Sequence, residues 1–298
     1  MSPRTLVLVK RFMWRFKEAF KRRLYRLHPR SIYWRHHLRT RPDEPLTATI
    51  DHDLKARVWP GDVLGESLYV RGYFEQQETK FVKQILKPGM VFIDVGANMG
   101  YYSLLAAKLV GQAGQVHSFE PNPRMFQELT YNVELNGFSN ISLNSQALAD
   151  KPGQARLSRY DKGEEVYCSL SNSSYPGAEI IGYDDVSVQT LDNYINKNGI
   201  DKVDLIKIDV EGAELMVLQG AQNLLSDSRK LIVMLEFDQR LCDAFDYTVN
   251  DILQTLEEYD FKVYTLSDGL FEHVSETTDI HRLCSVNFAA TNASFSYE

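Results

Sequence analysis

The chain of 298 residues lacks the features that mark several specialised protein classes. Its three cysteines, Cys168, Cys242 and Cys284, are widely spaced, so they form neither a disulfide framework nor a zinc-ligand pattern and favour a reducing compartment. No apolar run reaches the roughly 18 to 20 residues that a membrane-spanning helix needs. Repeats and low-complexity tracts are absent, and 44% hydrophobic and 24% charged residues are ordinary globular proportions. The sequence therefore predicts a cytoplasmic globular protein.

Acidic residues are scarce at the N-terminus. Residues 1–41 contain 13 Lys and Arg but only one acid, Glu18, for a net charge of +12, whereas the remaining 257 residues carry −19. The basic arm is therefore expected to meet something anionic. The acidic body argues against nucleic acid as a partner, because phosphate backbones attract basic surfaces.

The arm also has a helical period. Basic residues interrupt its apolar positions, which excludes a secretory signal peptide. The pattern predicts a helix over residues 4–27 in peripheral contact with an anionic membrane, at its inner face. The alternative is docking on the acidic body or on a second subunit, and the oligomeric state stays open. The apolar stripe consists of Leu6, Val9, Met13, Phe16, Phe20, Leu24 and Leu27.

Residues 1–45 are predicted to be this extension and a tether, and residues 46–298 one domain with its core at about 70–290. Prolines are frequent between 28 and 60, which predicts a tether with at most a short strand. From about residue 70, apolar strands alternate with helices of 10 to 15 residues, the pattern of a doubly wound parallel sheet. The predicted strands are 90–95, 115–120, 141–145, 203–209, 231–237, 261–266 and 283–290; the predicted helices are 75–86, 101–110, 123–136, 213–225 and 249–259; residues 150–187 read as a β-rich excursion.

The most informative motif is residues 91–101, Val-Phe-Ile-Asp-Val-Gly-Ala-Asn-Met-Gly-Tyr. An apolar strand ends in Asp94 and a turn with Gly96, Asn98 and Gly100 follows. Ligands of open α/β sheets bind outside the carboxyl ends of the strands, and these turn residues allow close backbone approach and left-handed conformations. The spacing is not G-x-G-x-x-G, and an acid here would repel a pyrophosphate, so Asp94 suits a ligand with a positive group. An ordinary turn of an α/β protein is the alternative.

The next predicted strand ends in a second acid, Glu120, before Pro121-Asn122-Pro123. A carboxylate at this strand end can accept hydrogen bonds from both hydroxyls of a ribose, and its charge argues against a 2′-phosphate. His117, inside the same strand, is expected to pack in the core. Two acids at two adjacent strand ends favour a binding site over chance surface positions.

Lys207 and Asp209 interrupt a third apolar strand. Buried charges are costly unless they are paired, so charges at a strand end are often functional. Lys207 is expected to pair with Asp209 or with Glu236, which ends the following strand. Glu214 is expected to be structural, at the favourable N-terminal end of the next helix.

These segments resemble the FkbM family of S-adenosylmethionine-dependent methyltransferases. The resemblance covers about residues 70 to 290 and includes four segments in the family's order. It implies a Rossmann-like, seven-stranded class I methyltransferase fold with two added strands and a reversed last one. It also implies O-methylation of a sugar, glycan or secondary-metabolite hydroxyl, so the expected partner is a small-molecule or glycan acceptor. The segments are Gly72–Glu75, Ile93–Tyr102, Phe119–Pro123 and Ile206–Gly212.

The resemblance also implies roles for individual residues. Glu120 would bind the ribose of S-adenosylmethionine, and Asp94 would hold its ammonium directly or through water. Asp209 would lie nearest the reactive methyl group. Gly96, Asn98 and Gly100 would line the methionine end, and Gln146 and Ala147 the adenine edge.

A hydroxyl is a poor nucleophile until it is deprotonated, so a general base is expected. The candidates are Asp209 first, Glu236 second and His273 third. As a less favoured alternative, Asp209 with Glu236 or Asp238 would bind Mg²⁺, which would acidify the hydroxyl. Metal-independent catalysis is the preferred interpretation.

Two other functional classes use the same residues. In a nucleic-acid methyltransferase the basic arm would bind phosphates, but a body of net charge −19 does not favour this. In a scaffold protein the fold would persist without the chemistry, and the intact Asp94, Glu120 and Asp209 speak against that.

Overall fold

The computed structural model describes residues 27–160, 180–227, 230–267, 270–274 and 286–292. The chain divides into two compact units, Met1–Gly72 and Tyr73–Glu298. Most of the predicted arm helix lies outside the described residues, so its contact with a membrane stays a prediction. Among the described residues, no helix combines the length and the apolar character that crossing a membrane requires.

The first unit contains regular structure where the prolines predicted a tether. Helix α2 (Pro29–Thr40) precedes an antiparallel hairpin of β1 (Leu46–Ile50) and β2 (Leu54–Val58), and α3 (Val63–Arg71) follows. The tether prediction was wrong because proline is well tolerated at the first position of a helix, where its missing N–H has no helical partner. Trp34 is 1% exposed and anchors the core of this unit.

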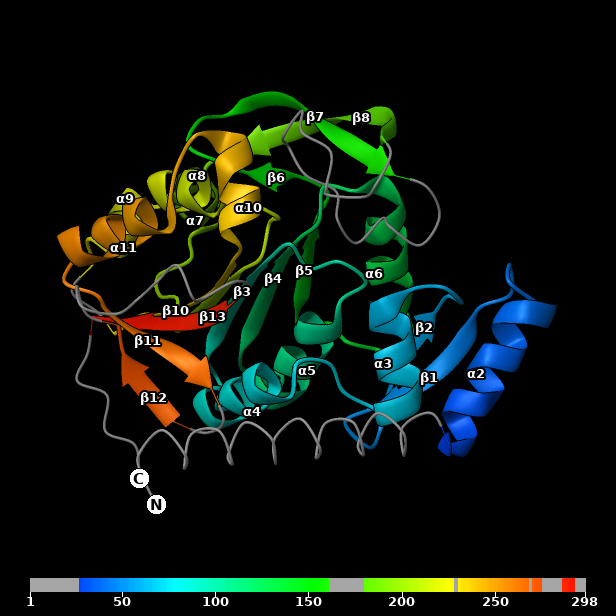
Figure 1. Cartoon of the computed structure of the whole chain (residues 1–298). Helices are drawn as coiled ribbons and strands as arrows, with labels where there is room; N and C mark the ends of the chain where they lie inside the picture. Colours follow the sequence, from blue (N-terminus) through cyan, green and yellow to red (C-terminus); the bar gives the residue numbers. More distant parts are fainter. Residues whose placement is uncertain (1–26, 161–179, 228–229, 268–269, 275–285, 293–298) are drawn as a thin grey trace, which may run out of the picture. The chain divides into compact units, whose positions relative to one another are not determined.

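The second unit is built on an eight-stranded sheet with the order β12-β11-β13-β10-β9-β3-β4-β5 (Figure 1). Strands β10, β9, β3, β4 and β5 run parallel, and β13 lies antiparallel between β10 and β11. This confirms the predicted class I methyltransferase fold with its reversed last strand. The strands are β3 (Val91–Val95), β4 (Gln115–Phe119), β5 (Ile141–Asn144), β9 (Leu205–Ile208), β10 (Ile232–Phe237), β11 (Lys262–Ser267), β12 (Leu270–His273) and β13 (Val286–Thr291).

The two faces of this sheet differ in what covers them. Ile93 and Val95 of β3, with Ile206 and Ile208 of β9, pack in one apolar core with residues of α7 (Leu191–Asn198), α8 (Glu214–Gln219) and α11 (Val249–Glu258). The alternate residues point to the other face, where α5 (Tyr101–Val110) contacts α4 (Gln76–Ile85) and α6 (Pro123–Asn136). Asp94 and Lys207 lie on this second face.

One predicted helix is broken. Residues 213–225 form two short helices, α8 and α9 (Gln222–Leu225), with Gly220 between them. A Cβ atom at Gly220 would lie 2.1 Å from the carbonyl oxygen of Ala149. The chain therefore bends where its backbone meets the segment that follows β6.

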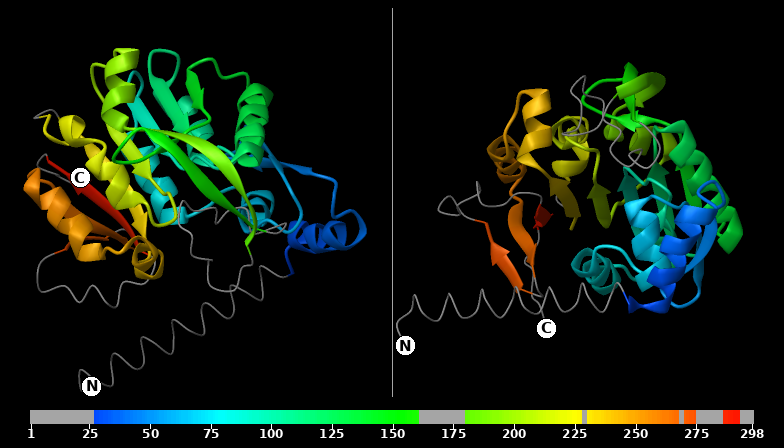
Figure 2. Two further views of the ribbon diagram at one scale, coloured as in Figure 1. Left: turned by 90° about the horizontal axis from the view of Figure 1, so that it is seen from above. Right: turned by 45° about the vertical axis from the view of Figure 1, so that its right-hand side comes forward.

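The predicted β-rich excursion is confirmed in its described part. Strands β6 (Ala147–Leu148), β8 (Ile180–Gln189) and β7 (Gly153–Tyr160) form a separate three-stranded sheet (Figure 2). Residues 161–179 lie outside the described ranges. Since β6 begins three residues after β5 ends, this small sheet starts at the carboxyl edge of the large one.

Candidate active site

A buried charge cluster lies where β3 and β9 end. The parallel register places Asp94 beside Lys207, and Asp209 follows two residues later on the same face. The Lys207 ammonium is 2.7 Å from Asp209 Oδ2, which confirms the first of the two predicted pairings. It also lies 5.0 Å from the centre of the Tyr102 ring. Burial lowers the pKa of Lys207, but Asp209, Asp94 and Glu75 raise it more, so the residue stays a cation.

Asp94 has one carboxylate oxygen without a partner. The side chain is 1% exposed, and its Oδ2 accepts a hydrogen bond of 2.6 Å from Ser103 Oγ. Oδ1 is buried and has no hydrogen bond. Burial raises the pKa of Asp94, and the Lys207 ammonium and the Ser103 hydroxyl oppose the rise. An orphaned carboxylate oxygen at the end of a parallel strand is a position for a positive group or a water.

Glu120 ties the end of β4 to the turn after β3. Its Oε2 accepts a hydrogen bond of 2.7 Å from the Asn98 N–H, and its Oε1 one of 2.8 Å from the Asn122 N–H. Burial raises the pKa of Glu120 to about 7, although both N–H groups oppose the rise. A carboxylate offers about four acceptor positions, so two backbone bonds leave room for a ligand hydroxyl.

The turn at 96–100 uses its own N–H groups. Those of Gly96 and Ala97 donate to the Phe119 carbonyl, that of Met99 to Asn98 Oδ1, and that of Gly100 to the Ala97 carbonyl. With Asn98 bound to Glu120, every N–H of the turn has a protein acceptor. A phosphate-binding loop needs N–H groups that point at the ligand. This turn is therefore no cradle for a pyrophosphate.

The glycines of the turn are required by packing. Gly96 has φ of +83°, and a Cβ there would lie 1.8 Å from the Asp209 carbonyl oxygen. Gly100 has φ of +97°, and its Cβ would lie 2.6 Å from Leu129 Cδ1. We expected these glycines to permit close approach of a ligand. In the structure they permit close approach of β9 and α6.

Glu75 belongs to the cluster but had no predicted role. It precedes α4, and its Oε2 accepts a hydrogen bond of 2.9 Å from the Tyr102 hydroxyl. Burial raises the pKa of Glu75 to about 7, Asp209 adds to the rise and Lys207 opposes it. The only sequence signal was its place in the segment Gly72–Glu75.

The loop after β9 is held by Glu214. Its Oε1 accepts from the N–H groups of Val210 (3.2 Å) and Gly212 (3.1 Å), and the Tyr247 hydroxyl donates to its Oε2 (3.1 Å). Glu211, inside this loop, has φ of +54°, an uncommon value for a residue with a side chain. These bonds agree with the structural role predicted for Glu214, which shapes the loop that presents Asp209.

Except for Glu75, the residues of this cluster fall within a match to a known family. Residues 94–263 match the family described as the Methyltransferase FkbM domain, which is more than half of the chain. The chain belongs to the FkbM family. It is thus an S-adenosylmethionine-dependent methyltransferase.

Curated relatives carry similar descriptions. The FkbM-family chain is 27% identical over 228 residues to the 31-O-demethyl-FK506 methyltransferase FkbM of Streptomyces tacrolimicus, covering 67% of this chain and 82% of the relative. It is 27% identical to the 2-O-methyltransferase NoeI of Sinorhizobium fredii, covering 50% and 65%. It is 26% identical to the hexuronic acid methyltransferase AglP of Haloferax volcanii, covering 53% and 61%.

The cluster fits the cofactor of this family. S-adenosylmethionine carries an ammonium, a sulfonium and a ribose but no phosphate. The orphaned oxygen of Asp94 suits the ammonium, which it would bind directly or through a water. Glu120 suits the ribose, and the internally bonded turn requires no anion.

Gln146 and Ala147, predicted at the adenine edge, lie where β6 leaves the large sheet. The Gln146 side chain is bonded to β8: its Oε1 accepts from Gln189 Nε2, and its Nε2 donates to Ser187 Oγ at 3.4 Å. Ala147 is 5% exposed and begins β6. The side chains of both residues are engaged in the small sheet.

The three candidate bases do not all lie at the same place in the sheet. Glu236 follows Leu235, the partner of Ile208, so it stands level with Asp209 on the adjacent strand. His273 ends β12, at the far edge of the sheet and four strands from β9. At about 4.8 Å per strand this is roughly 19 Å away. The structure therefore does not support His273 as a base that acts with Asp209.

The magnesium alternative requires several carboxylates that converge on one point. Within the described ranges, no group of three or more His, Cys, Asp or Glu side chains is placed to hold a metal ion. Asp238, the third carboxylate of the magnesium alternative, is 7% exposed at the start of α10 (Gln239–Cys242).

His117 is 5% exposed and bonds the Tyr194 hydroxyl through Nδ1 at 2.9 Å, so its predicted place in the core is confirmed.

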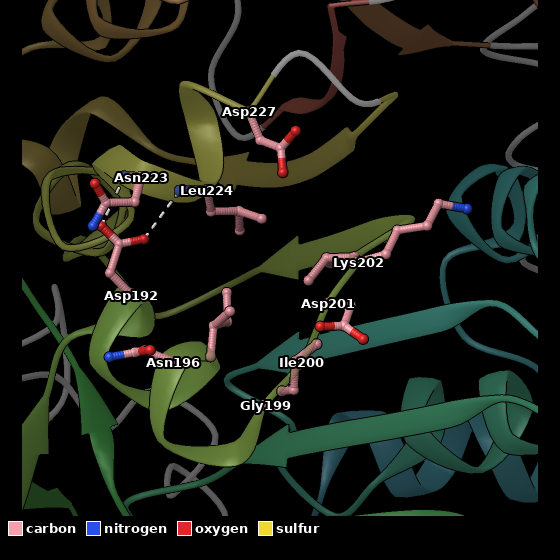
Figure 3. Close-up of a pocket in the computed structure, with 11 residues that line it drawn as sticks. Asp192, Asn196, Gly199, Ile200, Asp201, Lys202, Asn223, Leu224 and Asp227 are labelled. Atoms are coloured by element: carbon pink, nitrogen blue, oxygen red, sulfur yellow. Dashed lines mark hydrogen bonds between the residues drawn. The ribbon is translucent and has the colours of Figure 1, made fainter.

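A pocket of about 630 Å³ lies elsewhere, beside α7 and the chain that enters β9 (Figure 3). Asp192 accepts hydrogen bonds from the N–H groups of Asn223 (2.8 Å) and Leu224 (3.0 Å), shown as dashed lines. Lys202 and Val203, which line the pocket, precede β9, whereas Asp209 follows it. This pocket is therefore at the opposite end of β9 from the charge cluster.

Proposed function

We propose that this methyltransferase transfers the methyl group of S-adenosylmethionine to a hydroxyl of a sugar, a glycan or a secondary metabolite. The observation that carries the proposal is the acidic cluster at the carboxyl ends of β3, β4 and β9, with its unpartnered Asp94 oxygen. The relatives named as 2-O-, 31-O- and hexuronic acid methyltransferases support oxygen as the acceptor atom.

In this proposal each acid has a separate task. Asp94 binds the ammonium directly or through a water, and Glu120 accepts from the ribose hydroxyls. Asp209, with 27% of its side chain exposed and one oxygen bound to Lys207, faces the acceptor. Much of the catalysis is positioning, which supplies up to ~7 to 11 kcal/mol when donor and acceptor are well oriented.

Asp209 is proposed as the base that takes the proton of the acceptor hydroxyl, with Glu236 as the second candidate. Lys207 fixes the orientation of one Asp209 oxygen at 2.7 Å. The other oxygen is then free of that bond and available to the substrate. Because α8 and the Glu214 bonds fix the loop after β9, the base is held in place before the acceptor binds.

The cofactor assignment predicts that Asp94→Ala and Glu120→Ala each weaken S-adenosylmethionine binding by at least ~1 to 3 kcal/mol, the cost of leaving partners of charge-assisted hydrogen bonds unmade. Titration calorimetry measures the affinity, and a thermal melt confirms that each variant is folded. Glu134→Ala, an exposed position on α6, is the matched control. Unchanged affinity in both folded variants would refute the site, and measurable NAD binding would contradict the reading of the turn.

The base assignment predicts that Asp209→Asn leaves S-adenosylmethionine affinity nearly intact and lowers turnover by about 10²-fold or more. Product mass after incubation with methyl glycosides of neutral hexoses and of hexuronic acids measures the turnover. Asp201→Asn, an exposed aspartate ahead of β9, is the control. Full activity in Asp209→Asn would move the role to Glu236, whereas activity lost in EDTA and restored by Mg²⁺ would establish the magnesium alternative.

A further inference from the structure

Glu75 occupies a strained and half-buried position at the start of α4. Its φ of +40° is in the left-handed region, which residues with a side chain seldom adopt. Such strain persists where the surrounding structure imposes it and is frequent at functional sites. One Glu75 oxygen accepts from the Tyr102 hydroxyl, and the other has no hydrogen-bond partner among the described residues. Glu75 also lies outside residues 94–263, which match the family.

The charges around Lys207 do not balance. Three carboxylates, those of Asp209, Asp94 and Glu75, act on one ammonium. Glu75 bonds the Tyr102 hydroxyl, and the Tyr102 ring lies 5.0 Å from the Lys207 ammonium that pairs with Asp209, so Glu75 stands at the end of the site assigned to the methyl group. In a partly buried environment charges are screened less than in water. When Glu75 is ionised, its charge adds to that of Asp209 against the single Lys207 ammonium, and a cation would offset the excess.

Methyl transfer changes the charge of the bound ligand. The acceptor oxygen bonds the methyl carbon, the C–S bond breaks with both electrons staying on sulfur, and the acceptor proton goes to the base. The sulfonium becomes a neutral thioether, so the ligand loses one positive charge while its ammonium and carboxylate are unchanged.

We infer that Glu75 is a specificity-determining residue that makes the site prefer the sulfonium substrate over the thioether product and so favours product release. The inference rests on the proposed use of S-adenosylmethionine at this site. A fixed carboxylate near the sulfur attracts the substrate and has no such attraction for S-adenosylhomocysteine. Glu75 supplies this charge from the residue that precedes α4, ahead of the matched family region.

The preference is expected to depend on pH. The groups that act on Glu75 are Asp209 and Lys207 at the end of β9, Glu78 on α4 and Tyr102 on α5. Burial, Asp209 and Glu78 raise the pKa of Glu75 to about 7, although Lys207 and the Tyr102 hydroxyl oppose the rise. Protonation at pH 6 removes its charge, so the preference for the sulfonium falls as the pH is lowered from 7.5 to 6.

Calorimetry with three ligands tests the inference without an acceptor. S-adenosylmethionine and sinefungin, whose amine replaces the sulfonium, both carry a positive centre, and S-adenosylhomocysteine does not. At pH 7.5 the two cationic ligands should bind at least about fivefold more tightly than the thioether. Glu75→Gln should reduce this ratio by at least about threefold with little change for the thioether. Glu257→Gln on the exposed face of α11 should retain the ratio.

The outcomes separate the inference from the proposed function. No binding of any of the three ligands to the wild-type protein would refute the proposed cofactor site itself. Binding with an equal ratio in the wild-type protein and folded Glu75→Gln would refute the role of Glu75 alone. If Glu75→Gln does not fold, the wild-type ratio at pH 6 and 7.5 decides, and an unchanged ratio would overturn the inference.

Discussion

The Gly96→Ala variant should unfold far more readily than the wild-type protein, with a loss of at least about 4 kcal/mol in the free energy of unfolding. Two costs add at this position. A left-handed conformation costs roughly 1 to 2 kcal/mol for a residue with a Cβ atom. The second cost is steric, because the new Cβ would lie 1.8 Å from the Asp209 carbonyl oxygen and would force β3 and β9 apart at their ends.

Gly89→Ala separates the two costs. Gly89 has φ of +84°, against +83° for Gly96, and a Cβ there meets nothing within 4 Å. Its substitution should therefore show only the conformational cost. Chemical denaturation of the three proteins gives the comparison, and equal losses for Gly96→Ala and Gly89→Ala would show that the β3 and β9 ends can separate at little cost.

Lys207→Met should destabilise the protein by about 3 to 5 kcal/mol, the usual result of removing one partner from a buried charge pair. The side chain is 7% exposed and methionine fills a similar volume, so the lost packing is small. What remains is a group of carboxylates, Asp94, Asp209 and Glu75, without their cation. A thermal melt with calorimetric enthalpy measures the loss.

The pH dependence of the stability of Lys207→Met shows whether unpaired carboxylates cause its destabilisation. A carboxyl group whose pKa is raised on folding holds a proton that the unfolded chain releases, so stability falls as the pH rises from about 4.5 to the raised value. The pKa of Glu75 is already raised to about 7. The loss should therefore be larger at pH 8 than at pH 5.5, and adding Asp209→Asn should recover part of it.

Lys202→Met is the matched control for this variant. Lys202 also pairs with an aspartate, Asp204, but its side chain is 51% exposed. Exposed ion pairs contribute about 0 to 1 kcal/mol, so this variant should remain close to wild-type stability. A similar loss of stability in both variants would mean that burial of the Lys207 ion pair adds nothing to the free energy of unfolding.

Local signals predicted the helices and strands of the second unit well. Helix α5 follows Gly100 and ends before Gly111, and α6 begins after the Asn122 side-chain cap and ends before Gly137. These capping residues coincide with the ends of an apolar period, so both helices were predicted to the residue. The same pattern predicted that the acids at the carboxyl ends of the strands lie close together, because parallel strands end at one edge of the sheet.

Tertiary relations could not be predicted in this way. Glu75 precedes Asp94 by a whole helix and a turn, and only the packing of α4 against α5 brings it to Tyr102. His273, the third candidate base, is far from Asp209 because β13 lies between β10 and β11 and β12 is at the far edge of the sheet. Neither relation has a periodic signature in the sequence.

The contact between Gly96 and the Asp209 carbonyl has a consequence for how this enzyme can diversify. In the proposed function the turn after β3 serves the methyl donor and the loop after β9 serves the acceptor, and their backbones meet at Gly96 and Asp209 with no side chain between them. Side chains that select the acceptor can therefore change around Asp209 without altering the separation of donor and base. In the proposed function this backbone contact would keep the distance between methyl donor and base constant among relatives with different acceptors.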